Sequence, residues 1–475
     1  MRNNLWLICL GWLFSVTIQA QQPPVNAEYS FTLDEAIEFA LENSYQSINA
    51  RRDVAKALKR KWEATADGLP QINAAVDYQN QLKQPVSLLP ASAFDNRQST
   101  INTVEEFFGI SPTGNPDPLD GFIPVVFGTK QQLSATATLS QLIFDGSYLV
   151  GLEAAKSFLQ FTNDSQEKVL LEVRKGVINA YGSVLVAQES VQILKNNVDA
   201  LEKNYQETKK IFENGLAEEE DVEQLQITLL QIKNQLSNTE RLEKIAMQMF
   251  NLNIGVDVNA NTELSDKLED LSMKNMDQSV ITTPFSIENN VDYRLAELLT
   301  EQRRLELKLE KSKALPSLSA FVNYGTQANS NSFTFLESDQ RWFQSSILGA
   351  SLNIPIFSSL KRSAKTKQAK IAEDQAKTDF LRTQQEIKLQ YDTAISDFKF
   401  SIESYDTAKQ NLTLAERIEK KNQIKYSEGL ATSFELRQAQ LQLYSSQNDA
   451  LNAMLDIINK KAELETILNT PNTNN

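Results

Sequence analysis

The chain contains two copies of one long unit. Residues 69–78 begin with Leu-Pro and then alternate apolar and polar side chains, and residues 315–324 repeat this pattern. Later in each copy a Gly-Leu pair interrupts a long helical pattern, first at Gly215-Leu216 and again at Gly429-Leu430. Each copy therefore consists of a helix, a strand, a loop, a second strand and two very long helices that meet at the Gly-Leu turn. This duplication predicts a pore built by repetition.

The amino terminus has the pattern of an export signal. Arg2 provides a positive start, residues 5–18 are mostly apolar, and Ile18-Gln19-Ala20 is similar to a signal-peptidase site. The apolar stretch is short for a bilayer-spanning helix, which favours cleavage after Ala20 over a membrane anchor. Residues 1–20 are therefore predicted to be a signal peptide.

The composition excludes several kinds of chemistry. The chain has no histidine, and its only cysteine, Cys9, lies in the predicted signal peptide. The mature chain therefore lacks disulfides, cysteine nucleophiles and imidazole metal ligands. The formal net charge of −14 makes nucleic acid a poor candidate partner. Because no nucleophile–base cluster or metal set is visible, we expect no enzyme activity, catalytic residue, cofactor or metal site.

Two long stretches without proline, 125–283 and 356–470, carry the helix signal. Apolar residues step by three and four along residues 218–251 and again along 391–412, which is the rhythm of a heptad seam. Helical hairpins are therefore predicted over residues 146–251, with a tip at 215–216, and over residues 358–468, with a tip at 429–430.

Four segments between the helices alternate apolar and polar residues as strands do: 72–78, 133–139, 318–324 and 347–356. A half-buried sheet of a soluble protein has the same local pattern. The export signal and the segment length, which suits a tilted transmembrane strand, favour a membrane barrel. Four strands leave unpaired edges, so closure of a barrel requires several copies of the chain.

Proline is predicted to separate helices from strands. Pro70 and Pro316 each end a helical ladder and push the preceding residue towards an extended conformation, so they should mark helix–strand junctions. Gly146 is predicted to mark the exit from the second strand into the long helix. Residues 81–130 are rich in proline and glycine and are predicted to form a long irregular loop, either an external lid or a loose surface loop.

Several motifs together resemble the TolC-type outer-membrane efflux proteins. They are FTLDEA at residues 31–36, ALEN at 40–43, LIFDG at 142–146, the two Leu-Pro pairs and the two Gly-Leu turns, and they span the mature chain in the family's order. The resemblance implies a mostly α-helical fold with a small transmembrane β part: a homotrimer with a twelve-stranded β-barrel in outer-membrane lipid, continued by an α-helical barrel in the periplasm.

The same resemblance implies a passive, gated exit duct of a tripartite efflux or secretion system. Substrates would come from an inner-membrane pump through a periplasmic adaptor protein. The residues alone also allow an exported coiled-coil scaffold that spans the periplasm without transport activity. Such a scaffold accounts for the heptads but not for four alternating segments placed alike in two repeats. The transported substrate is not encoded in these motifs.

The family's periplasmic gate matches particular positions. In the family, an aspartate six residues after the first tip glycine bonds to a tyrosine three residues before the second, and Asp221 and Tyr426 occupy these positions. The family's gate arginine is absent, because Ala431 stands there. Two acidic constriction residues correspond to Glu435 and Gln438, so one carboxylate per chain remains. The resemblance assigns the gate to Asp221, Tyr426 and Glu435; a local interpretation of Glu435 is charge complementation at a helix start.

The resemblance also implies that the tip turns contact the adaptor, through Gly215, Leu216, Gly429 and Leu430. The complete predicted map is: 1–20 signal peptide; 21–70 N-terminal segment and first tunnel helix; 71–145 two strands with loop 81–130; 146–251 first hairpin; 252–289 equatorial belt; 290–314 helix; 315–357 two strands; 358–468 second hairpin; 469–475 C-terminal tail.

Overall fold

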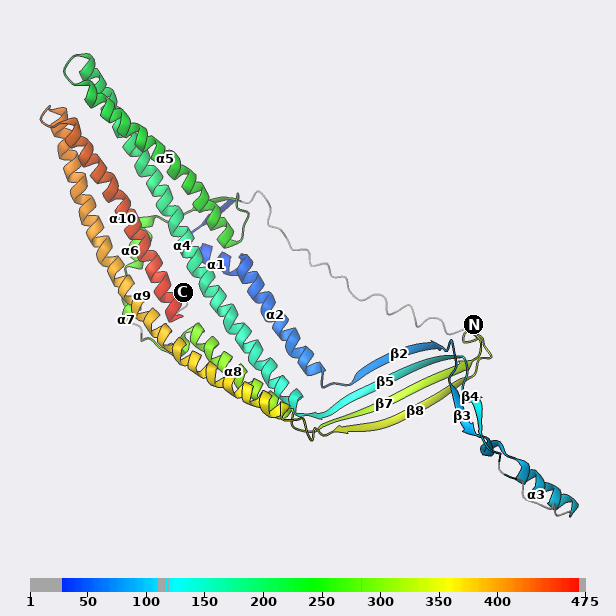
Figure 1. Cartoon of the computed structure of the whole chain (residues 1–475). Helices are drawn as coiled ribbons and strands as arrows, with labels where there is room; N and C mark the ends of the chain where they lie inside the picture. The colour runs from blue at the N-terminus through cyan, green and yellow to red at the C-terminus, as the bar shows by residue number, and fades with distance from the viewer. Residues whose placement is uncertain (1–27, 110–116, 118, 283, 470–475) are drawn as a thin grey trace. The chain divides into compact units, whose positions relative to one another are not determined.

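The computed structural model describes residues 28–109, 117, 119–282 and 284–469 (Figure 1). The predicted signal peptide and almost all of the predicted tail lie outside these ranges. The described chain divides into two compact units. The helical unit is drawn from residues up to 60, 156–304 and from 370 onward, and the strand unit from residues 61–155 and 305–369.

Two long hairpins dominate the helical unit. The first consists of α4 (Gly146–Glu213) and α5 (Glu219–Ile254), and the second of α9 (Lys361–Ser427) and α10 (Ser433–Leu468). Three shorter helices accompany the hairpins: α1 (Leu33–Asn43), α2 (Tyr45–Ala66) and α8 (Val291–Ser312). None of the helices in the described part of the chain is both long and apolar enough to cross a membrane.

The predicted heptad seams are confirmed as packed cores. In α5 the seam residues Leu225, Leu229 and Ile232 are buried, and in α9 Phe398 and Tyr405 are buried. The remaining seam residues of α9 pack against the same cluster: Tyr391, Ile395, Ile402 and Leu412. Small residues along α10 permit close packing of a neighbouring helix, and three alanines there are buried: Ala439, Ala450 and Ala453.

A belt of short elements ties distant parts of the helical unit together. Strand β1 (Glu28–Phe31) pairs in parallel with β6 (Asn261–Leu264), and α6 (Leu268–Asn275), α7 (Ser279–Thr282) and the 3-10 turn η2 (Ile287–Asn289) follow β6. The family resemblance implies a belt over 252–289, but the pairing with the N-terminal strand was not predicted. Helix α5 also continues to Ile254, beyond its predicted end at residue 251.

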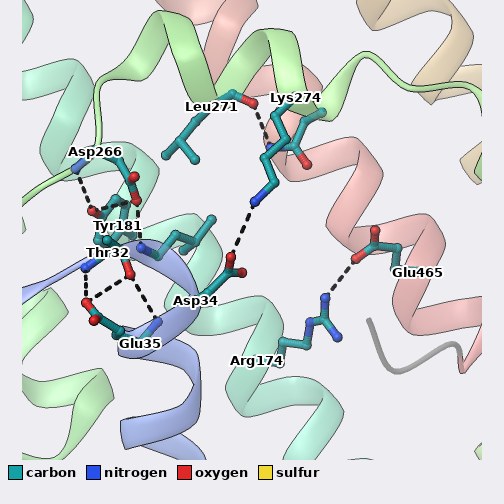
Figure 2. A network of polar contacts seen from close by, with 11 residues as sticks. Thr32, Asp34, Glu35, Arg174, Tyr181, Asp266, Leu271, Lys274 and Glu465 are labelled. Carbon is teal, nitrogen blue, oxygen red and sulfur yellow. Dashed lines mark hydrogen bonds and ion pairs between the residues drawn. The ribbon is translucent and has the colours of Figure 1, made fainter. Parts of the chain in front are cut away.

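Figure 2 shows the polar contacts that fasten this belt. The Asp266 carboxylate accepts a hydrogen bond from the Leu33 amide at 2.7 Å and lies 3.0 Å from the Tyr181 hydroxyl, which is buried in the core. Lys274 of α6 pairs with Asp34 of α1 at 3.3 Å. Beside the belt, Arg174 of α4 pairs with Glu465 of α10 at 3.2 Å, and burial raises the pKa of the Glu465 carboxyl. The belt is therefore held by specific polar bonds as well as by packing.

The strand unit contains a four-stranded antiparallel sheet. It consists of β2 (Gln71–Asn80), β5 (Gln131–Asp145), β7 (Ser317–Ser330) and β8 (Trp342–Asn353), in the order β2-β5-β7-β8 (Figure 1). Strands β5 and β7 are longer than the predicted segments, and the register between them shifts between Leu142 and Phe144. Within the described chain, β2 and β8 each have one edge without a partner strand.

The predicted irregular loop at residues 81–130 is wrong in part. Its described residues form β3 (Val86–Pro90), the turn η1 (Ala91–Phe94), α3 (Arg97–Phe108) and β4 (Phe122–Val126), and β3 pairs with β4. Pro90 and Pro124 contribute to the proline content from which the irregular loop is predicted, yet both lie within strands. In a two-stranded sheet each strand is an edge strand, where a missing N–H is tolerated.

Candidate functional site

The two helical tips have the same backbone geometry. Gly215 and Gly429 have φ values of 74° and 72°, in the left-handed region that glycine adopts without steric cost. The following leucine amides bond back into the preceding helices: Leu216 to the Ile211 carbonyl at 3.1 Å, and Leu430 to the Lys425 carbonyl at 2.7 Å. Leu216 is 80% exposed and Leu430 is 77% exposed, so each turn presents a leucine to its surroundings.

The predicted bond between Asp221 and Tyr426 is wrong. The Tyr426 hydroxyl lies 2.7 Å from Thr208 Oγ1 on α4, whereas the Asp221 carboxylate accepts a hydrogen bond from Ser433 Oγ on α10. No hydrogen bond joins these two side chains to each other in the described structure, because each finds a nearer partner on the opposite hairpin. Both residues nevertheless connect the first hairpin to the second.

Electrostatics still link Tyr426 to Asp221. Burial raises the pKa of the Tyr426 hydroxyl, and the nearby carboxylates of Asp221 and Glu207 raise it further, whereas the bond to Thr208 lowers it. The phenol therefore stays protonated and available as a hydrogen-bond donor at neutral pH.

Glu435 lies at the start of α10 in a capping box. Its carboxylate accepts a hydrogen bond from the Thr432 amide at 2.8 Å, and its own amide donates to Thr432 Oγ1 at 3.2 Å. Hydrogen bonds to the carboxylate, first from the Thr432 backbone and then from the Thr432 hydroxyl, lower the pKa of the exposed Glu435 carboxyl. The local interpretation from the sequence is thus realised, and a charged carboxylate remains at the first turn. Gln438 lines a neighbouring groove of about 270 Å³ between α5 and α10.

A ladder of polar contacts between the hairpins was not predicted from the sequence. Asn197 donates to Gln447 at 3.1 Å, and Asn204 exchanges two amide hydrogen bonds with Gln423, at 3.2 and 3.1 Å. The Thr208 contact to Tyr426 and the Ser433 contact to Asp221 continue the ladder towards the tips. Asn197, Asn204 and Thr208 are at most 8% exposed and follow heptad spacing along α4. That spacing was the available signal, but only apolar seam residues were considered.

One carboxyl group near the ladder has no partner. Glu419 on α9 forms no hydrogen bond or ion pair with any residue in the described ranges, and burial raises its pKa. Burial also raises the pKa of Tyr444 on α10, and the Glu419 charge contributes to that increase. This part of the hairpin contact therefore holds a carboxyl group whose ionised form is disfavoured by burial and is not offset by an ion pair with a described residue.

The four-stranded sheet has two chemically different faces. Register places most apolar residues of the four strands on one face, where Ile72, Val76 and Leu348 are 75%, 72% and 80% exposed; Phe343 and Ile347 of β8 lie on the opposite face. The opposite face is mostly amides and hydroxyls; Phe321 is one exception, and its ring lies where a Cβ on Gly349 would be. The apolar face comprises Ile72, Ala74, Val76, Tyr78, Leu133, Ala135, Ala137, Leu139, Leu318, Ala320, Val322, Tyr324, Leu348, Ala350 and Leu352.

The predicted junction residues lie between helices and strands. Pro70 follows the end of α2 at Ala66 and precedes β2, and Pro316 lies between α8 and β7. Gly146 is the first residue of α4, directly after β5. A Cβ at Gly146 would lie 2.7 Å from the Leu315 side chain, so this junction requires glycine unless its neighbours shift.

Comparison with known proteins agrees with this geometry. The chain is 23% identical over 361 residues to outer membrane protein TolC of Vibrio cholerae serotype O1, covering 71% of this chain and 77% of that protein. The crystal structure of the outer membrane protein VceC from Vibrio cholerae superposes with a TM-score of 0.67 at 15% identity, covering 92% and 95% of the two chains. The Campylobacter jejuni CmeC outer membrane channel gives 0.69 at 14% identity, covering 92% and 85%.

The profile of the family described as "Outer membrane efflux protein" matches residues 36–249 and 286–470, which is most of the chain. The protein therefore belongs to the outer membrane efflux protein family and localises to the outer membrane, with its helical hairpins in the periplasm.

Proposed function

We propose that this protein is the outer-membrane exit duct of a tripartite efflux or secretion system. Three copies would each contribute four strands to one barrel and two hairpins to one periplasmic tunnel. Substrates would pass through passively, delivered by an inner-membrane pump through a periplasmic adaptor. Membership of the efflux family supports this assignment.

The observation that carries the proposal is the two-faced sheet with two open edges. An exposed apolar face extends over all four strands, and lipid is the environment in which such a face is stable. Strands β2 and β8 leave backbone groups unpaired, which hydrocarbon does not tolerate. Joining β2 of one copy to β8 of the next satisfies both requirements. A coiled-coil scaffold in the aqueous periplasm would not require an apolar sheet face of this kind.

The gate is proposed to be the polar ladder near the tips. Asp221 and Tyr426 act in it through Ser433 and Thr208, in place of the direct bond found in the family. Three copies of Glu435 would place a charged ring at the periplasmic end, because the capping box keeps each carboxylate ionised. Ala431 adds no charged contact to this closed state.

Mass measurement and single-channel recording test the duct. The purified protein in mild detergent should have the mass of three chains and should conduct in a planar bilayer. The double variant Asp221→Ala with Tyr426→Phe should raise conductance without changing the mass, because it removes two contacts between the hairpins. A stable monomer that keeps its strands, or a trimer that never conducts, would refute the proposal.

A further inference from the structure

The segment between β2 and β5 forms a distinct projection, here called the β3–β4 arm, comprising β3, η1, α3 and β4. Its base is tied to the sheet, since the Gln81 amide donates to the Lys130 carbonyl at 2.8 Å. The Lys130 amide in turn donates to Asn331 Oδ1, at 3.1 Å, in the connection between β7 and β8. The arm therefore follows directly after β2, which is an edge strand of the sheet.

One face of the arm is entirely apolar and uncovered. Register places Val86 opposite Val126, Leu88 opposite Pro124 and Pro90 opposite Phe122. Because the side-chain period of a strand is two, these six residues share one face. Leu88 is 64% exposed and Phe122 is 70% exposed. A two-stranded hairpin is marginally stable alone in water, so this face requires a partner.

Lipid does not meet that requirement. In the described chain, β3 and β4 pair only with each other, so the hairpin has two open backbone edges. Unpaired sheet edges do not occur in the hydrocarbon region, because each unsatisfied amide or carbonyl group costs several kcal/mol there. We therefore expect the apolar face to be covered by a protein surface outside the hydrocarbon region, where water or polar side chains can satisfy the open backbone edges.

The neighbouring copy presents such a surface. The Asn80 end of β2 and the Trp342 start of β8 lie at the same end of the sheet. If β2 pairs with β8 of the next copy, the arm emerges beside the connection that precedes that strand. Leu336 in this connection is 88% exposed, and Phe343 at the start of β8 is 55% exposed.

We propose that the apolar face of the β3–β4 arm packs on the corner formed by residues 331–343 of the neighbouring copy and clasps the trimer together. This inference rests on the proposed trimeric duct. The corner itself is held in place, because the ring of Phe335, which is buried, lies 6.0 Å from that of Tyr78 on β2. The clasp would supply each copy with a contact beyond strand pairing.

Photo-crosslinking tests the clasp directly. The chain has no cysteine after Cys9, so a single Leu88→Cys variant can carry a benzophenone maleimide. On illumination of the detergent-solubilised protein we expect a product with the mass of two chains, with the crosslink on residues 331–343. Phe107→Cys is the control, because Phe107 is 81% exposed and lies in α3 of the arm, outside the apolar face.

Other outcomes overturn the clasp. Crosslinks within one chain, to lipid in vesicles, or to a different protein in isolated outer membranes would each assign the face to another occupant. Native mass measurement separates this failure from failure of the duct: a conducting trimer without these crosslinks refutes only the clasp, whereas a monomer that does not conduct refutes the proposed function.

A stability measurement provides a second readout. Leu88→Asn with Phe122→Asn should lower the temperature at which the trimer dissociates in detergent. The matched variant Leu82→Asn with Phe107→Asn removes the same two residue types from sites outside the face that are more exposed, 91% and 81% against 64% and 70%, and should leave that temperature unchanged. Equal effects of the two variants would contradict the clasp.

Discussion

Replacing Asn204 with leucine should loosen the contact between the two hairpins. Asn204 is 5% exposed and exchanges two hydrogen bonds with Gln423, so the substitution removes both bonds and leaves the Gln423 amide without its partner. Leaving such a group unsatisfied costs about 1–3 kcal/mol. This cost falls on the closed state, because water satisfies Gln423 once the hairpins separate. A change of about 1–3 kcal/mol corresponds to a shift of roughly 5- to 150-fold towards the open state.

The double variant Asn204→Leu with Gln423→Leu should behave differently. Replacing both partners with apolar groups is nearly neutral or stabilising, so the open probability should return to the parental value or fall below it. Single-channel recording in planar bilayers measures these shifts. Gln206→Leu is the control, since Gln206 is exposed and bonds only to Glu202 of its own helix. The reasoning is refuted if Asn204→Leu behaves like Gln206→Leu, or if the double variant opens further than either single variant.

Three other changes test the remaining assignments. Glu435→Gln should lower cation preference, because it removes one charge from each of three chains, and an unchanged reversal potential would leave Glu435 with its capping role alone. Glu419→Gln should raise the melting temperature at pH 7, because the raised pKa of Glu419 means that its ionised form destabilises the folded state. Below the ordinary carboxyl pKa of 4.5 the group is protonated in the folded and unfolded states alike, so the variant and the parent should then melt at the same temperature. If the gain persists in acid, the ionised carboxylate is not its cause. Leu216→Asp with Leu430→Asp should abolish export in cells but preserve conductance in bilayers, since both leucines are exposed at the proposed adaptor contact; export at the parental rate would remove that role.

Sequence reasoning succeeded where one physical constraint recurs over many residues. The heptad rhythm persists along α5 and α9, and burial of Leu229 and Phe398 follows from it. The strand pattern also predicted the apolar face of the sheet, because alternation translates directly into faces. Partner strands along the belt were not predictable in this way, since the four residues of β1 carry too short a pattern to indicate a pairing with β6.

Contacts between single side chains were harder to predict. Whether Tyr426 reaches Asp221 or Thr208 depends on the relative rotation of the two hairpins, which the sequence pattern does not encode. The buried amides of the ladder were missed because a polar residue at a seam position looks like a solvated one until its partner is known. Prolines at residues 90 and 124 were misleading for a related reason, since their effect depends on the number of strands in the sheet.

The polar face of the sheet has a consequence for cargo. Asp77 and Asp145 are the only charged residues in the four strands, and Asp145 is occupied at the start of α4, where it accepts hydrogen bonds from the Ser147 and Tyr148 amides. In the proposed duct, the wall of the final passage would then consist largely of serine, threonine, asparagine and glutamine side chains. Such groups hydrate anions and cations alike and hold neither tightly. Molecules of very different charge could pass this wall alike, and discrimination among them would belong to the proposed Glu435 ring at the other end of the duct and to the proteins that load the channel.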